Sequence, residues 1–134
     1  MDPYLYAVPV AALLALGFAG FKAWRVMGAD PGDEDMVDIA SQIREGAMAF
    51  LAAEYKVLAL FVVIVAVILG LVNMSGETQH PLIAFSFVCG AVASGLAGFI
   101  GMRVAVEANV RTTNAAKQGL GPALAVAFNG GTGM

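Results

Sequence analysis

The chain has 134 residues, of which 60% are hydrophobic and 13% charged, and its mean hydropathy is +0.81. Soluble domains are about a quarter charged, so this composition excludes an ordinary soluble domain and indicates an integral membrane protein with three or four spans. The net charge of −3 gives no reason to expect nucleic-acid binding, and the single cysteine, Cys89, excludes an internal disulfide.

The first apolar run, residues 3–21, lies between Asp2 and Lys22 and contains no charge. Trp24 suits a membrane interface, so we predict a first span near residues 3–24. A cleaved signal peptide is the alternative interpretation, but such a peptide begins with basic residues, and none precedes this run.

Residues 28–38 contain Pro31, Gly32 and five acidic residues, which predicts a solvated loop leading into a helix. Residues 39–56 then show one apolar helix face: Ile39, Ile43, Ala47, Phe50 and Leu51. We predict a helical extension over 36–56 that continues into a second span near 57–73. A buried soluble helix is the alternative, but the apolar run is too long for it.

A polar turn over residues 73–80 precedes the third predicted span, 82–102. Small residues stand four apart along this span in two adjacent rows: Gly90, Ser94 and Gly98, and Ala93, Ala97 and Gly101. Small residues allow helices to approach closely in a bilayer. We therefore interpret the rows as packing surfaces and assign Gly90, Ser94 and Gly98 structural roles.

The pattern of residues 103–117 predicts a second helical extension. Arg103 and Arg111 each lie four residues from Glu107, so we expect Glu107 to be shared between these two arginines, in a structural role. A fourth apolar stretch, residues 120–128, runs for roughly half the length of a crossing before Asn129. This pattern predicts that the chain is the N-terminal part of a larger membrane domain.

The basic residues predict the orientation. All seven lysines and arginines lie either between the first two spans or after the third. Under the positive-inside rule both of these segments are cytoplasmic, which leaves the N-terminus and the 73–80 turn outside.

Few residues suggest a catalytic or metal-binding site. Asp30, Glu34 and Asp38 stand four apart and on a helix would form a carboxylate ladder suited to Mg²⁺, but Pro31 argues against a helix there, so we favour a solvated loop. His80 has no partner nearby in sequence. The sequence contains no Ser/His/Asp set, phosphate-binding glycine loop or Cys/His cluster.

Several segments, in order, resemble the membrane-bound, ion-translocating pyrophosphatases. Residues 43–51 (Ile-Arg-Glu-Gly-Ala-Met-Ala-Phe-Leu), followed by 54–56 (Glu-Tyr-Lys), are similar to that family's first cytoplasmic segment. Residues 101–105, 108–113 and 115–116 are similar to the segment after its third helix. Gly119 and residues 127–128 and 130–131 are similar to the start of its fourth helix, so the resemblance covers about residues 36–131.

The resemblance implies an all-α, polytopic transmembrane helix bundle with two concentric rings of helices. It implies hydrolysis of Mg²⁺-pyrophosphate on the cytoplasmic side coupled to outward transport of H⁺ or Na⁺. It also implies a homodimer, a bacterial or archaeal inner membrane, and an N-terminus outside.

In that family pyrophosphate is bound by helices five and six, beyond this chain, which supplies outer-ring helices one to three and the start of four. The resemblance therefore places no catalytic, cofactor-binding or metal-binding residue here, and the Mg²⁺ ligands are expected on the remaining helices of the full-length pump. We expect the 134-residue chain alone to be inactive. The alternative is a small non-enzymatic membrane scaffold or a holin-like helix hairpin.

Overall fold

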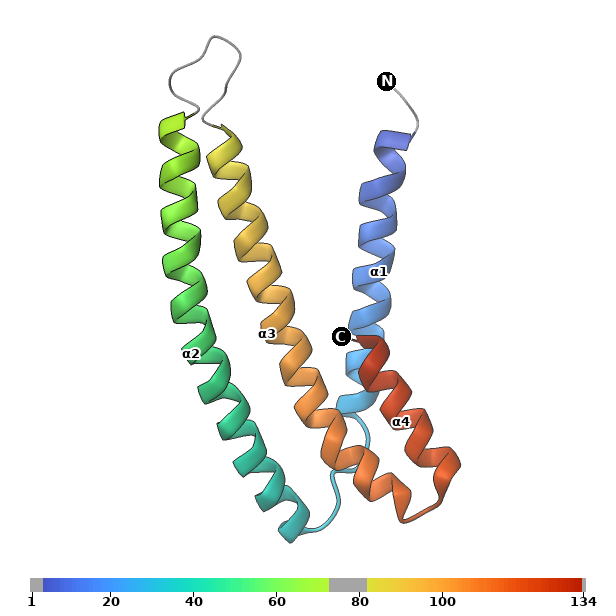
Figure 1. The fold of residues 1–134 in the computed structure, drawn as a ribbon. Helices are drawn as coiled ribbons and strands as arrows, with labels where there is room; N and C mark the ends of the chain where they lie inside the picture. Colours follow the sequence, from blue (N-terminus) through green and yellow to red (C-terminus); the bar gives the residue numbers. More distant parts are fainter. Residues whose placement is uncertain (1–3, 73–81, 134) are drawn as a thin grey trace. The chain divides into compact units, whose positions relative to one another are not determined.

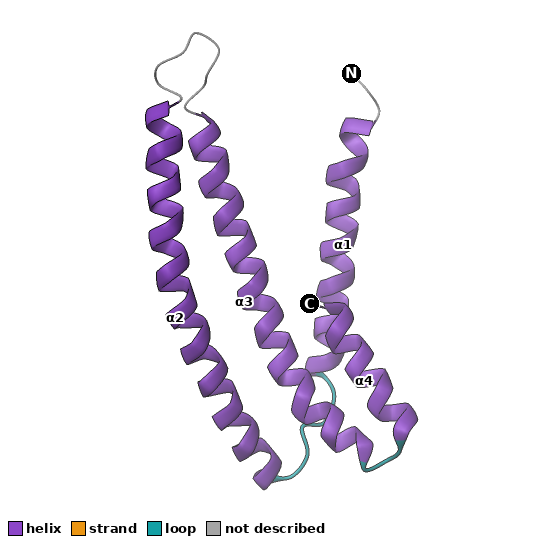
Figure 2. Cartoon of the chain, viewed as in Figure 1, coloured by secondary structure: helices purple, strands orange, loops and turns teal. Residues whose placement is uncertain are grey.

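The computed structural model describes residues 4–72 and 82–133, and side chains from residue 7 onward. All four elements in this part of the chain are helices: α1 (Tyr4–Met27), α2 (Glu34–Val72), α3 (Leu82–Ala116) and α4 (Leu120–Gly133) (Figures 1 and 2). The predicted all-α, polytopic class is confirmed. The predicted turn at 73–80 and His80 lie outside the described residues.

Three of these helices, α1 to α3, are long and apolar enough to cross a membrane, with mean hydropathies of 1.6, 2.8 and 2.0 over their most apolar windows. The predicted span 82–102 falls within α3, and the described part of the predicted span 57–73, residues 57–72, falls within α2. Large apolar side chains on these helices are exposed, including Leu13 at 69%, Leu60 at 63% and Leu82 at 65%. Lipid tails are as apolar as these side chains, so a bilayer is the solvent that suits them.

The two predicted extensions are continuous with the spans that they adjoin. α2 runs without a break from Glu34, two residues before the predicted start, because Asp33 caps it. α3 ends at Ala116, where the N–H groups of Lys117, Gln118 and Gly119 donate to carbonyls three residues earlier. Gly119 has a φ of +126°, which a residue with a side chain rarely adopts, so the helix stops there.

The fourth apolar stretch, residues 120–128, lies within α4, and the helix extends beyond it. α4 continues through Asn129 to Gly133, and the Thr132 hydroxyl donates to the Phe128 carbonyl oxygen at 2.7 Å, one helical turn earlier. The helix can be longer than the apolar stretch because the backbone hydrogen bonds of a helix do not require apolar side chains.

The chain divides into two compact units, residues 1–45 with 100–134, and residues 46–99. In the first unit α4 packs against α1 (Figure 1). This unit contains most of the buried apolar side chains, which are Val26, Val104, Val106, Ala108 and Ala123. In the second unit, the remaining parts of α2 and α3 form a pair in which Leu51 is buried.

Candidate functional site

The loop between α1 and α2 is shaped by its own aspartates. The Asp30 carboxylate accepts a hydrogen bond from the Gly32 N–H at 2.9 Å, and Gly32 has a φ of +98°. The Asp33 carboxylate accepts from the Met36 N–H at 3.1 Å, which is the N-cap bond that starts α2. The sequence Asp-Pro-Gly-Asp therefore makes a tight turn followed by a helix cap.

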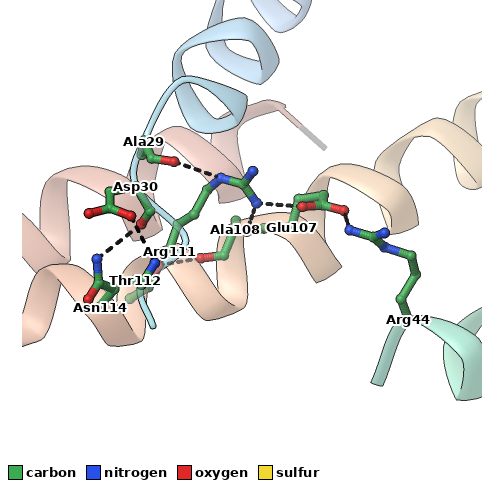
Figure 3. A network of polar contacts seen from close by, with 9 residues as sticks. Ala29, Asp30, Arg44, Glu107, Ala108, Arg111, Thr112 and Asn114 are labelled. Carbon is green, nitrogen blue, oxygen red and sulfur yellow. Dashed lines mark hydrogen bonds and ion pairs between the residues drawn. The ribbon is translucent and has the colours of Figure 1, made fainter. Parts of the chain in front are cut away.

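Three side chains at the end of α3 and just after it hold this loop, and we call Arg111 and Asn114 on α3 and Lys117 in the following turn the loop clamp. Arg111 Nε donates to the Ala29 carbonyl oxygen at 3.0 Å, and Asn114 Nδ2 donates to the Asp30 carbonyl oxygen at 3.2 Å (Figure 3). Lys117 Nζ pairs with the Asp33 carboxylate at 2.8 Å. Residues three apart share one face of a helix, so α3 presents Arg111 and Asn114 to the loop, and Lys117 follows in the turn directly after the helix.

Glu107 joins the loop clamp to α2. Its carboxylate forms ion pairs with Arg111 on its own helix and with Arg44 on α2, and the two guanidinium groups lie on either side of it (Figure 3). Arg111 also donates to the Glu107 carbonyl oxygen at 3.0 Å. The side chains of Arg111 and Glu107 are 11% and 14% exposed, whereas that of Arg44 is 49% exposed.

The predicted sharing of Glu107 was therefore half correct. The pair with Arg111 forms as expected, but the second arginine is Arg44 and not Arg103. Arg103 is exposed and forms no ion pair within the described part of the chain. Helix spacing identified Arg103 as a possible partner of Glu107. The packing of the first turns of α2 against α3 instead places Arg44 on that carboxylate.

The pKa of the Asp33 carboxyl lies below its ordinary value. The largest cause is the hydrogen bond from Lys117, and the N–H of Met36 adds to it. Both stabilise the charged carboxylate. The Lys117–Asp33 pair is solvent-exposed, with the side chains 55% and 58% accessible, so this contact locates the loop more than it stabilises the fold.

The carboxylate ladder does not form. Asp30 precedes the helix, and its carboxylate binds the backbone of Gly32; Glu34 and Asp38 lie on α2, where Asp38 accepts from Gln42 at 3.1 Å. No group of three or more metal-ligating side chains is present among the described residues. These residues do not fit Mg²⁺.

One of the predicted packing residues of α3 meets a neighbour. A Cβ built on Gly98 would lie 3.0 Å from Tyr55 Oη, whereas one on Gly90 would meet nothing within 4 Å, and Ser94 is exposed. Tyr55 Oη donates to the Gly95 carbonyl oxygen at 2.5 Å. The sequence interpretation missed Tyr55 and Gly95, although a tyrosine in an apolar helix needs a hydrogen-bond partner.

Contacts of α4 were also missed. Lys22 Nζ donates to Asn129 Oδ1 at 2.8 Å and lies 5.2 Å from the centre of the Phe18 ring. A Cβ on Gly130 would lie 2.5 Å from the Ala108 Cβ, so α3 and α4 cross at van der Waals distance. These contacts join α1, α3 and α4 within the first unit.

Chemically, the described polar groups form a structural brace. The loop clamp is engaged with the α1–α2 loop, Glu107 pairs with Arg111 and Arg44, and every buried side-chain N or O atom in the described residues has a hydrogen-bond partner. We identify no nucleophile with an adjacent base in this part of the chain. The arrangement suits the positioning of helices.

Comparison with known proteins gives one family. The model of the family described as inorganic H⁺ pyrophosphatase matches residues 13–134. A K⁺-insensitive pyrophosphate-energized proton pump of Methanosarcina mazei is 39% identical over 131 residues, covering 98% of this chain and 19% of the pump.

Pumps for two different ions are among the similar proteins. A K⁺-insensitive pyrophosphate-energized proton pump of Moorella thermoacetica is 44% identical over 92% of this chain and 17% of the pump. A K⁺-stimulated pyrophosphate-energized sodium pump of Thermotoga maritima is 41% identical over 91% of this chain and 16% of the pump. The chain thus spans about a fifth of the length of these relatives. The matches support the pyrophosphatase resemblance over the holin-like alternative.

Proposed function

The chain belongs to the inorganic H⁺ pyrophosphatase family, and we propose that it supplies the N-terminal, outer-ring helices of a membrane pump that hydrolyses pyrophosphate and moves H⁺ or Na⁺. The observation that carries this proposal is the family match over residues 13–134. It is supported by three helices long and apolar enough to cross the membrane.

Within such a pump the role of this segment is positional. The loop clamp and Glu107 tie together the α1–α2 loop, α2 and α3, and Lys22 ties α1 to α4. Pyrophosphate hydrolysis needs groups that neutralise phosphate charge and orient water, commonly bound metal ions. We propose that Mg²⁺ is held by helices that this chain does not contain, since its described carboxylates do not form a site.

The proposal includes an orientation and an assembly. All seven basic residues fall in two segments that the positive-inside rule assigns to the cytoplasm, so the N-terminus lies outside. We propose a bacterial or archaeal inner membrane as the location and a homodimer as the assembly of the complete pump. Both rest on family resemblance alone.

A chimera tests the proposed function. This chain replaces the equivalent segment of the Moorella thermoacetica pump, and pyrophosphate-dependent phosphate release and proton uptake are measured in inverted membrane vesicles with Mg²⁺. We expect both activities in the chimera and neither in vesicles containing the chain alone. The matched control replaces the same segment with three unrelated membrane spans.

A chimera that inserts and is stable in the membrane, yet releases no more phosphate than the control, contradicts the proposal. Phosphate release by the chain alone also contradicts it, since release would require a site within these residues. In that case Asp30→Asn and Asp38→Asn would test the carboxylate ladder directly.

A further inference from the structure

An apolar groove runs between the first turns of α2 and the last turns of α3, and both walls lie in the same compact unit. Its volume is about 140 Å³. The lining residues are Met36, Ile39, Ala40 and Ile43 on α2 and Val106, Asn109, Val110 and Thr113 on α3.

The groove lies in segments that carry charge on nearly every turn. Arg44 and Glu45 follow its α2 wall, Arg103 precedes its α3 wall, and Glu107 and Arg111 interleave with that wall. Charged residues are rare in the hydrocarbon layer, so these segments belong in the aqueous layer or the interface, where lipid tails do not cover an apolar surface.

Two apolar residues of the α2 wall are nevertheless exposed. Ile39 is 58% and Ile43 46% exposed, and they stand four apart on one face of α2. Scattered apolar side chains on a surface are ordinary, but a contiguous apolar groove at aqueous depth marks an interaction surface.

The dimensions and chemistry of the groove describe what fits it. An engineered apolar cavity of about 150 Å³ binds benzene, so this groove has room for one bulky apolar side chain. Ala40 in its lining leaves space for such a side chain. Asn109 is exposed at the edge, and its side-chain amide makes no hydrogen bond within the described residues, so it is available to a polar group beside the apolar one.

We propose that this groove receives a helix from the rest of the pump, which inserts one leucine or phenylalanine between the two walls and places a polar group against Asn109. The inference rests on the proposed function. The relatives are about five times as long as this chain, so a pump of this family has many further helices available to cover the groove. Packed helices interdigitate, with side chains of one helix inserted among those of its neighbours.

Cysteine protection tests the proposal. In a Cys89→Ala background, Ile39→Cys is labelled with a membrane-impermeant maleimide in inverted vesicles, once in the 134-residue chain and once in the chimera with the Moorella thermoacetica pump. The matched control is Glu45→Cys, which is exposed on the opposite face of α2. We expect Ile39→Cys to react about tenfold more slowly in the chimera, and Glu45→Cys to react at the same rate in both.

Equal labelling of Ile39→Cys in the chain and the chimera overturns the proposal. So does equal protection of Ile39→Cys and Glu45→Cys in the chimera, which indicates general occlusion. Slow labelling of Ile39→Cys in the isolated chain, together with its dimerisation, assigns the groove to a second copy instead. Ile43→Cys repeats the measurement on a second residue, so that disturbance by one substitution is recognised.

The two proposals fail separately, because pyrophosphate hydrolysis is measured on the same vesicles. A chimera that hydrolyses pyrophosphate while Ile39→Cys remains reactive contradicts only the groove assignment. A chimera in which Ile39→Cys is protected but no phosphate is released contradicts only the proposed function.

Discussion

Arg44 on α2 and Glu107 on α3 form an ion pair, and Glu107 also pairs with Arg111 one turn along its own helix. A carboxylate that is 14% exposed thus bridges two helices and the loop that Arg111 holds. Leaving this largely buried carboxylate without a cationic partner would cost folding free energy. Removing the carboxylate would also cost folding free energy, because its two arginines would lose their partner.

Replacing Glu107 tests this bridge. Glu107→Gln keeps the shape but removes the charge, and we expect it to cost about 2 kcal/mol, since hydrogen bonds to charged groups contribute about 1.5–3 kcal/mol. Arg44→Gln loses a half-exposed pair and should cost less than about 1 kcal/mol. The free energy of unfolding, measured by denaturant titration in detergent micelles, checks both values.

Arg103→Gln is the matched control for that series, because helix spacing alone makes Arg103 an equivalent partner of Glu107. Its exposed side chain forms no ion pair in the described structure, so the cost should stay within about 0.5 kcal/mol. A loss for Arg103→Gln as large as that for Glu107→Gln contradicts the arrangement.

Gly98 has no side chain, so Tyr55 can approach the surface of α3 closely. A side chain on Gly98 would meet Tyr55 Oη at 3.0 Å, so we expect Gly98→Leu to destabilise the chain by about 1–3 kcal/mol through overpacking. Gly90→Leu is the control, since nothing lies within 4 Å of its Cβ position. Combining Gly98→Leu with Tyr55→Phe removes the hydroxyl and should recover part of the loss. Strict additivity of the two changes would show that these residues do not touch.

Gly130 permits the crossing of α3 and α4. Its Cβ position lies 2.5 Å from the Ala108 Cβ, so Gly130→Ala forces the helices apart and should cost about 1–3 kcal/mol. Gly131→Ala, with nothing within 4 Å, should cause no loss. Thermal unfolding followed by circular dichroism distinguishes the two, and an equal response from both variants contradicts the crossing.

Asp33 should make stability depend on pH. Its pKa is lowered in the folded chain by Lys117 and by the N–H of Met36, so its contribution is present above the unfolded value of 3.8. The contribution is lost as the pH falls through the lower folded value. We expect Asp33→Asn to reduce the loss of thermal stability between pH 7 and pH 3. Identical pH profiles for wild type and Asp33→Asn would contradict this assignment.

The orientation can be checked by labelling. With Cys89→Ala as background, a cysteine at position 118 should react from the cytoplasmic side and a cysteine at position 76 from the outside. Gln118 is exposed in the turn after α3, so a cysteine at this position is accessible to the reagent. Reaction of position 118 from the outside, or of position 76 from the cytoplasm, reverses the proposed topology.

Local patterns in the sequence predicted the helices and the class of protein. Apolar runs and helix periodicity are local properties, so they located the spans within α2 and α3 and the approximate ends of the extensions. The segments that begin at Ile43 and Gly101 occur in the same order as in the pyrophosphatases, and they were sufficient to identify the family. The pair of Glu107 with Arg111 also followed from sequence, because both residues lie on one helix and are one turn apart.

Only the tertiary structure decided which surfaces meet. The choice of Arg44 over Arg103, the contact of Tyr55 with Gly95 and the approach of Gly130 to Ala108 each depend on how two helices are rotated about their axes. A regular pattern of small residues shows that a helix can be approached closely, but it leaves that rotation undetermined. Packing of side chains from distant parts of the chain sets it, because close-packed interfaces accept only a few relative orientations.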